Sequence, residues 1–404
     1  MPEIKNSAEN SSTSYDVIIV GAGLVGMSMA LALARAGLNA VLLEKNNINT
    51  QFEATFDGRV SAIALGSKHI LNNIGAWEFM QDHAEPILDI RVTDGATPFF
   101  LHYDHSEVGD APFGYIVENR YIRHALFQAA SQLKNITLID NFTIKALSQT
   151  AYNATITGAR GEILQASLVI AADGRISQAR DLAGIDTIGW DYGQTAIVCT
   201  IEHSLPHHGL AQERFFPIGP FAVLPMTGNR SSLVWVEPND RVQIYLGLPE
   251  EEFVQEIKER VGSYLGDIRT VGGRFSYPLS LLHAKKYHAE RVAIIGDAAH
   301  GIHPIAGQGV NLGFRDVAAL SELIAKQHAL GLDIGAEDVL ENYASLRKFD
   351  NISMIAITDL LNRLFSNNIL PFRAARDIGL WTIGKLPAVK RMFMKHAMGV
   401  KKSG

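Results

Sequence analysis

The sequence predicts an α/β protein with a Rossmann-like dinucleotide-binding domain, an inserted antiparallel β-sheet domain and a C-terminal helical segment. A Gly-x-Gly-x-x-Gly pattern directly after a short apolar strand at residues 15–20 indicates the first domain. Short alternating segments separated by turn residues, at residues 189–278, indicate the inserted sheet. Apolar residues at helical spacing after residue 350 indicate the C-terminal segment.

The glycine pattern consists of Gly21, Gly23 and Gly26, and a helix of small residues at 27–36 follows it. A second strand then closes on Glu44, so an acidic side chain lies about twenty residues beyond the glycines. In this arrangement the glycines let the backbone approach a pyrophosphate, and the carboxylate accepts from a ribose hydroxyl. The motif predicts dinucleotide binding but does not by itself separate FAD from NAD.

The stretch at residues 291–316 reads as a strand, a polar loop and a helix start. Its apolar run ends at an acidic residue, at the carboxyl end of a strand, where open α/β sheets bind ligands. Two glycines then precede a helix whose first N–H groups are unpaired and favour negative charge. The candidate binding residues of this stretch are Gly296, Asp297, Gly307, Gln308, Gly309 and Asn311, with His303 and Pro304 in the loop as candidates to face a cofactor or substrate.

A third motif follows an apolar strand at residues 168–172. Asp173-Gly174 opens a stretch that ends at Arg180 and fits the pattern Asp-Gly-x-x-Ser-x-x-Arg. Two further polar residues border apolar segments: Arg59 precedes one, and Asn119 leads into a helix with an apolar face. On the residues alone, Arg59 is either a ligand contact or an ordinary surface cation.

Together these three motifs, in this order, resemble the aromatic-ring hydroxylases, the single-component flavoprotein monooxygenases similar to para-hydroxybenzoate hydroxylase. The resemblance implies an FAD-binding domain with an inserted substrate domain, and FAD as the cofactor with NAD(P)H and O₂ as co-substrates. It implies that Asp297 binds the ribityl chain and that Asp173-Gly174 serves both FAD and the nicotinamide cofactor. It also implies contacts from Arg59 and Asn119 to FAD.

A C-terminal signature narrows the resemblance to the polyprenyl-phenol ring hydroxylases of ubiquinone biosynthesis, related to the 2-octaprenyl-6-methoxyphenol hydroxylase of bacteria. The matching stretches are residues 358–367, 376–380, 386–390 and 397–399. The resemblance implies a polyprenyl phenol as substrate and makes other ubiquinone-biosynthesis proteins candidate partners. Two alternatives stay open: a related flavoprotein that epoxidises or reduces a lipid alkene, and a non-catalytic flavin-bearing scaffold. No motif names a base that would deprotonate the phenol. His303 is a candidate, but it is better explained as a structural loop histidine.

Charge and cysteine content limit which partners and which cellular compartment the protein can have. The formal net charge of −6 argues against nucleic acid as a partner. A single cysteine, Cys199, indicates a reducing cytoplasmic compartment.

Residues 373–404 carry eight Lys and Arg residues with one acidic residue, interleaved with apolar ones. They predict either a packed terminal helix or a peripheral anchor on the anionic inner face of the membrane, which the resemblance favours. We expect no metal site, since His203 and its neighbours lack a ligand set, and read those histidines as a solvated loop.

These observations give a complete division of the chain. We expect a disordered tail at 1–14, an FAD-binding domain at 15–84, 112–188 and 279–349, a substrate domain at 85–111 and 189–278, and a basic and apolar helical segment at 350–404.

Overall fold

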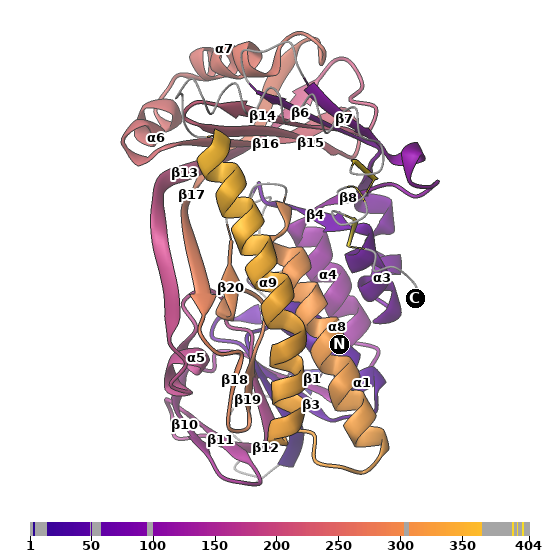
Figure 1. Cartoon of the computed structure of the whole chain (residues 1–404), viewed down its shortest axis with the longest axis vertical. Coiled ribbons are helices and arrows are strands. Elements are labelled where there is room, and N and C mark those ends of the chain that lie inside the picture. The colour runs from indigo at the N-terminus through magenta and orange to yellow at the C-terminus, as the bar shows by residue number, and fades with distance from the viewer. Residues whose placement is uncertain are drawn as a thin grey trace.

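The computed structural model of the 404-residue chain describes residues 3–4, 14–48, 50, 58–94, 100–302, 307–365, 390–391, 394 and 398–399. His303 and Pro304 lie outside these residues, as does most of the basic C-terminal segment. Within the described part, three sheets account for the strands. Figure 1 shows the molecule with one large sheet at the top and the other two below it.

The first sheet contains the predicted dinucleotide-binding motif and has nine strands in the described part of the chain. β3, β2, β12 and β19 are parallel neighbours in register, so their carboxyl ends meet at one edge. β3, β19 and the last four residues of β2 and β12 are apolar and buried, as expected for a covered parallel sheet. The strands are β1 (Glu3–Ile4), β2 (Ser14–Val20), β3 (Ala40–Leu43), β9 (Ile136–Ile139), β10 (Ile144–Gln149), β11 (Ala154–Gly158), β12 (Ile163–Ala171), β18 (His288–Ala289) and β19 (Val292–Ile294).

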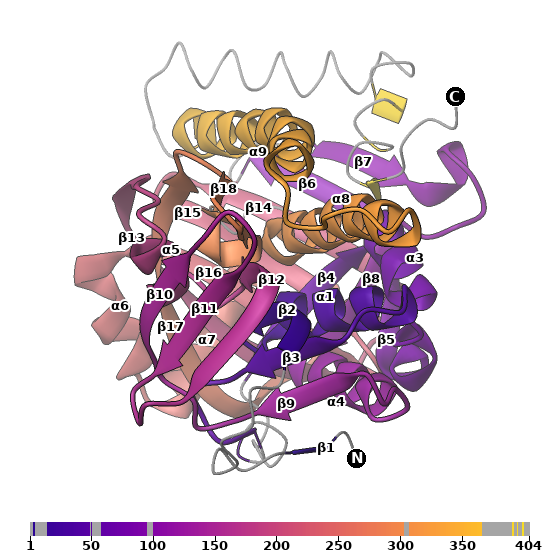
Figure 2. The ribbon, with the colours of Figure 1, turned by 90° about the horizontal axis from the view of Figure 1, so that it is seen from below.

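Helices pack beside this sheet and complete the Rossmann-like unit. The predicted first helix starts three residues early, at Leu24, because Gly23 in extended conformation already serves as its N-cap. Figure 2 shows the strands from β10 to β9 crossing the molecule, with α8 and α9 along one side. The helices are α1 (Leu24–Arg35), α3 (Leu65–Asn73), α4 (Asn119–Ala130), α5 (Gln178–Leu182), α8 (Gly309–Ala329) and α9 (Glu337–Phe365).

The second sheet has eight strands among the described residues and contains most of the predicted insertion. Its pairings are antiparallel, except that β14 and β6 run parallel. In sheet order the strands are β20 (His300–Gly301), β17 (Ile268–Ala284), β13 (Thr187–His203), β16 (Arg230–Pro238), β15 (Gly219–Met226), β14 (Leu210–Phe216), β6 (Asp89–Asp94) and β7 (Phe100–Asp104).

The two faces of the eight-stranded sheet have different neighbours. Helices α6 (Asn239–Leu246) and α7 (Glu250–Val261) cover the face that we call the outer face, and α7 buries Phe253, Ile257 and Val261 as its spacing predicts. The opposite, inner face is turned toward the Rossmann-like unit (Figure 1). The predicted α/β fold class with an inserted, largely antiparallel sheet is therefore confirmed.

A small third sheet lies between the two large ones. It contains β4 (Val60–Ala64), β8 (Gly114–Glu118) and β5 (Ala84–Ile87), with short 3₁₀ turns around it. Leu65 and Ile116 from this region share one apolar cluster with Ala211 and Met226 of the inner face. This cluster ties the eight-stranded sheet to the Rossmann-like unit.

Some elements differ from their expected limits. β13 and β17 are much longer than predicted and run from the eight-stranded sheet down along the Rossmann-like unit (Figure 1). The last described helix, α9, begins at Glu337, well before residue 350. Within the expected tail, Glu3–Ile4 pairs with β9.

His203 and His207 are buried and hydrogen-bonded, so the solvated-loop interpretation was wrong for both. The domain limits themselves stay a proposal.

Candidate functional site

The three sequence motifs meet at one edge of the nine-stranded sheet. Gly21 follows β2, Asp173 and Gly174 follow β12, and Gly296 and Asp297 follow β19. Because these three strands are parallel and adjacent, the motifs lie side by side although they are far apart in the sequence. The structure thus brings together the residues that were predicted to bind the cofactor.

The glycines of the first motif are required for two different reasons. Gly21 has φ +99°, and a Cβ there would lie 2.5 Å from the carbonyl oxygen of Ala172; a Cβ on Gly26 would overlap the carbonyl oxygen of Gly21. At Gly23, by contrast, a Cβ would meet no atom of the described residues within 4 Å. Protein packing therefore explains Gly21 and Gly26, whereas Gly23 leaves open space before α1. That helix start has no side-chain cap and no acid in its first turn, so it suits a phosphate.

Glu44, at the end of β3, is buried and supports the same loop. Its Oε2 accepts from the backbone N–H of Ala22 at 3.0 Å, and its Oε1 accepts from that of Asn46 at 3.0 Å. The carboxylate therefore fixes the loop's shape, and its contact with a ribose stays a prediction.

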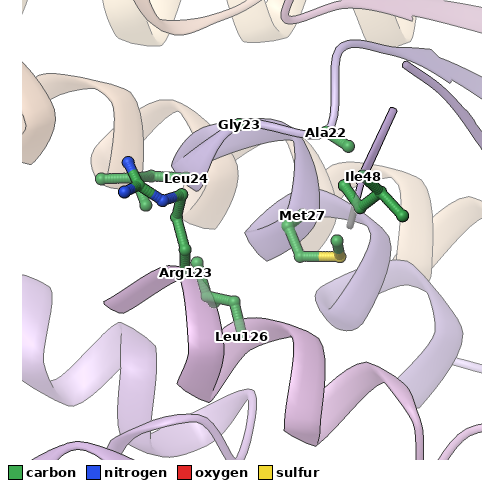
Figure 3. Close-up of a pocket in the computed structure, with 7 residues that line it drawn as sticks. All are labelled: Ala22, Gly23, Leu24, Met27, Ile48, Arg123 and Leu126. Carbon is green, nitrogen blue, oxygen red and sulfur yellow. The ribbon is translucent and has the colours of Figure 1, made fainter. Parts of the chain in front are cut away.

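A small pocket adjoins the glycine loop (Figure 3). Arg123 of α4 lines it together with Gly23 and Leu24 from the start of α1, so a cation lies next to the predicted phosphate position. No sequence motif indicates Arg123, because only the packing of α4 beside α1 brings it to the loop. The remaining lining residues are Ala22, Met27, Ile48 and Leu126.

The Asp-Gly motif has an internal structural role. The Asp173 carboxylate accepts from the hydroxyl of Ser177 and from the backbone N–H of Ala179, and Ser177 caps α5 by accepting from the N–H of Arg180. Burial raises the pKa of Asp173, and the bond from Ser177 opposes this. Arg180 is buried and donates to the carbonyl of Ala298 at 3.3 Å, which joins this motif to the next one. Contact of Asp173 and Gly174 with a cofactor stays a prediction.

The third motif leaves a carboxylate exposed. Gly296 has φ +59°, and its N–H donates to Asp316 at 2.9 Å. Asp297 is exposed and makes no hydrogen bond or ion pair with any described residue. A free carboxylate at the carboxyl end of β19 is placed to accept from ligand hydroxyls.

The start of α8 is fixed by Asn311. Its Oδ1 accepts from the N–H of Ala64 at 2.9 Å, and its Nδ2 donates to the carbonyls of Ala62 and Gly307 at 2.7 and 3.0 Å. These bonds hold α8 against β4, so Asn311 shapes the site from below its surface, and a direct contact with a cofactor stays a prediction. Gly309 at the helix start resembles Gly23, since a Cβ on it would contact no atom of the part of the chain that the structure describes within 4 Å.

Arg59 and Asn119, distant in sequence, lie together in the structure. The backbone N–H of Asn119 donates to the carbonyl of Arg59 at 3.0 Å, and its side-chain Oδ1 accepts from the hydroxyl of Ser61 at 2.7 Å. The Arg59 side chain is exposed. The two residues border one stretch of surface, and their contact with a cofactor stays a prediction.

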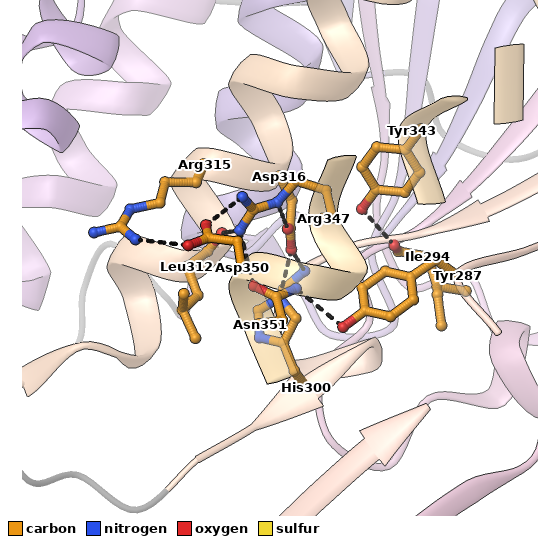
Figure 4. Close-up of polar contacts among 11 residues, drawn as sticks. Tyr287, Ile294, His300, Leu312, Arg315, Asp316, Tyr343, Arg347, Asp350 and Asn351 are labelled. Carbon is orange, nitrogen blue, oxygen red and sulfur yellow. Dashed lines mark hydrogen bonds and ion pairs between the residues drawn. The ribbon is translucent and has the colours of Figure 1, made fainter. Parts of the chain in front are cut away.

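A buried polar network, which no sequence motif indicates, lies behind the third motif (Figure 4). The Asp316 carboxylate is fully buried and pairs with His300 Nε2 at 2.6 Å and with Arg347 Nε at 2.7 Å. Arg347 also pairs with Asp350 at 2.5 Å. Burial alone would raise the pKa of Asp316, but His300 and Arg347 outweigh it and hold the pKa below its ordinary value. Through its bond to Gly296, Asp316 holds the backbone beside Asp297.

The comparisons with known proteins agree with this arrangement. Residues 14–348 match the model of a family described as an FAD binding domain. A ubiquinone hydroxylase, UbiL of Rhodospirillum rubrum, is 48% identical over 96% of this chain and 90% of its own. The 3-demethoxyubiquinol 3-hydroxylase of Escherichia coli is 33% identical over 95% of this chain and 98% of its own. This chain belongs to the FAD-dependent ubiquinone hydroxylase family.

As a member of this family, the protein is a flavoprotein monooxygenase, and its site fits FAD. The open positions at Gly23 and Gly309, the uncapped start of α1 and the exposed Asp297 carboxylate give room and polar partners for a dinucleotide. The fold agrees as well, since the p-nitrophenol 4-monooxygenase of Pseudomonas putida superposes with a TM-score of 0.78. The two chains are 20% identical, and the match covers 96% of this chain and 99% of that one.

Asp297→Ala is expected to weaken FAD binding by about 1.5–3 kcal/mol, the range for a hydrogen bond to a charged group. The carboxylate has no protein partner to lose in the described part of the chain, so thermal stability of the apoprotein should not change. FAD affinity is measured by fluorescence quenching during reconstitution, with Asp110→Ala, an exposed acid elsewhere, as the control. An unchanged dissociation constant would remove Asp297 from the site.

Proposed function

We propose that this monooxygenase hydroxylates the aromatic ring of a polyprenyl phenol in ubiquinone biosynthesis and uses NAD(P)H and O₂. The observation that carries the proposal is the similarity to a ubiquinone hydroxylase along 96% of the chain, together with the intact set of motifs at one sheet edge. Bound FAD supplies the redox chemistry, because it accepts a hydride from NAD(P)H and activates O₂.

The residues of the chain bind the cofactor, orient the substrate and exclude water. The uncapped start of α1 and Arg123 meet the pyrophosphate, and Asp297 meets the ribityl hydroxyls. The start of α8, which has no acid in its first turn, stabilises negative charge on the ring system. The inner face of the eight-stranded sheet lies across from these groups and presents mainly apolar side chains, which suits a greasy phenol.

The function is tested by incubating the holoenzyme with a short-chain prenyl phenol and NADH or NADPH. We expect phenol-stimulated oxidation of the nicotinamide and a product heavier by one oxygen on the ring. An oxygen or two hydrogens added to the prenyl chain would instead identify an alkene epoxidase or reductase. Absence of phenol-stimulated oxidation would support the scaffold alternative and contradict the proposal.

We further propose that the protein works in the cytoplasm at the inner face of the membrane, where such a substrate resides. No helix in the described part of the chain is both long and apolar enough to cross a bilayer. Met394 and Met398 are buried in the cluster that joins the two units, and Lys390 pairs with Glu107 at 2.5 Å. These three side chains pack against the body of the protein, so the proposed lipid contact rests on the basic residues before Lys390.

Reversing the charge of Arg373, Arg376 and Lys385 to Glu is expected to weaken binding to anionic liposomes. Each basic residue near such a surface contributes about 1 kcal/mol, and the binding should fall as salt rises. The matched control makes the same charge change at three exposed lysines elsewhere: Lys134, Lys145 and Lys286. Equal loss in both triple variants during co-sedimentation would show a non-specific charge effect, and no loss in either would sink the membrane proposal.

A further inference from the structure

One row of side chains crosses the inner face of the eight-stranded sheet, and it contains a single ionisable group. Glu213 on β14 lies opposite Ala222 of β15 and Val92 of β6. From Ala222 the register continues through β16 and β13 to β17. The row is Val92, Glu213, Ala222, Val234, Val198 and Phe275.

The direction of Glu213 follows from its neighbours on β14. Side chains alternate between the faces of a strand. Arg214 donates to the carbonyl of Arg260 on α7, and the Phe216 ring packs against Phe221, so both point to the outer face. Ala211 points to the inner face, where it joins the cluster shared with the Rossmann-like unit. Glu213 therefore points to the inner face as well.

The inner-face row reaches the predicted cofactor surface at its far end. A Cβ on Gly58 would lie 2.5 Å from the Phe275 ring, so that ring covers the residue directly before Arg59. The row thus starts at the sheet's β6 side and ends above the segment that carries a predicted FAD contact. A substrate held between the sheet and the cofactor would lie along it.

Glu213 has no partner within the described part of the protein. It makes no hydrogen bond or ion pair there, although water still reaches part of its side chain. Glu237, also in this sheet, shows the usual alternative: it is fully buried and accepts from the indole N–H of Trp235 at 2.7 Å. An enclosed carboxylate without a partner costs free energy, and such groups occur where a ligand supplies the partner.

We propose that Glu213 is the general base that takes the proton from the phenolic hydroxyl of the bound substrate. The proposal rests on the proposed function above. The O–H bond of the phenol breaks, its proton moves to a carboxylate oxygen of Glu213, and the electron pair stays on the phenolic oxygen. That pair delocalises into the ring, which makes the ring carbon more reactive toward the oxygen atom that O₂ supplies. When the hydroxylated carbon loses its own proton to water, Glu213 returns its proton to the phenolic oxygen.

The electrostatics of the site suit this role. Burial raises the pKa of Glu213 to about 7, which places its change of charge near the operating pH of a general base. The ionisable groups beside it on the inner face are Asp94 of β6 and Tyr103 of β7, and Glu85 lies on β5 of the small sheet, which packs against β15. Burial raises the pKa of both Tyr103 and Glu85, so both are neutral over a wider range of pH.

The first test measures binding rather than turnover. A short-chain prenyl phenol and its methyl ether are titrated into the holoenzyme, without NAD(P)H, between pH 5.5 and about 8.5, a range that spans the usual window for such bases. The ionised carboxylate accepts from a phenol but not from an ether. The phenol should therefore bind at least tenfold more tightly than the ether above pH 7 or so, and the difference should shrink as Glu213 is protonated at lower pH. In Glu213→Gln the difference should become small and independent of pH.

The second test measures chemistry in the same variants. Glu213→Gln should lower the rate of ring hydroxylation by about 100-fold or more, the range for loss of a general base. Glu213→Asp, which keeps a carboxylate, should recover part of the rate and of the pH dependence even where the Gln variant folds poorly. If Glu213→Gln keeps the wild-type preference for phenol over ether and the wild-type turnover, Glu213 is not the general base, and the proposed function still stands. Absence of phenol hydroxylation by the wild-type enzyme would overturn both.

Discussion

Asp316→Leu is expected to lower the free energy of unfolding by about 3–5 kcal/mol, the range for breaking a buried ion pair from one side. The substitution leaves His300 and Arg347 without their shared carboxylate, and both are almost fully buried. It also removes the acceptor of the Gly296 N–H, so the backbone beside Asp297 loses its support. The protein should therefore lose FAD together with stability.

Glu202→Gln provides the matched control, because its pair with Arg269 is exposed to water on both sides. Exposed pairs contribute about 0.2–1 kcal/mol, so that variant should unfold almost as the wild type does. Urea denaturation of the apoproteins gives the difference, and flavin fluorescence gives the release of FAD. A loss below about 1 kcal/mol in Asp316→Leu would mean that water or a shifted side chain replaces the carboxylate.

The edge of the nine-stranded sheet where the three motifs meet could be predicted from the sequence, because each motif is local in the chain. Each motif consists of a strand, a turn and a helix start that are adjacent in the chain, and parallel neighbours then bring their carboxyl ends together. Gly21 and Asp173 were found in this way. The sequence could not show that Asp173 and Asn311 are occupied by bonds to the protein itself, since those partners are fixed only after packing.

The residues that the sequence missed depend on contacts between distant segments. Asp316 and Arg347 are 31 residues apart, on two different helices, and neither position stands out from the helical pattern around it. Arg123 looks like a surface residue of α4 until α1 packs beside it. For Glu213, alternation along β14 gives two faces, but only the placement of α7 shows which face is turned to the Rossmann-like unit.

Gly23→Val is expected to weaken FAD binding by roughly 100-fold or more while leaving the apoprotein as stable as the wild type. Gly23 has φ −71° and ψ −174°, an extended conformation that valine adopts without strain. A Cβ there meets no atom of the described residues within 4 Å, so the substitution begins in open space. It does fill the space before the free N–H groups of α1, where the pyrophosphate is predicted to bind. Loss of two hydrogen bonds to a charged group, at about 1.5–3 kcal/mol each, accounts for the expected change.

Gly26→Val separates this effect from a general loss of the loop. A Cβ at Gly26 would overlap the carbonyl oxygen of Gly21, so this variant should unfold at a lower denaturant concentration as well as lose FAD. The two variants add the same side chain three positions apart, and only the first spares the fold. Denaturation of the apoproteins and FAD titration of both variants decide the matter. If Gly23→Val binds FAD as tightly as the wild type, the pyrophosphate does not lie in the open space before α1, and this assignment of the glycine loop fails.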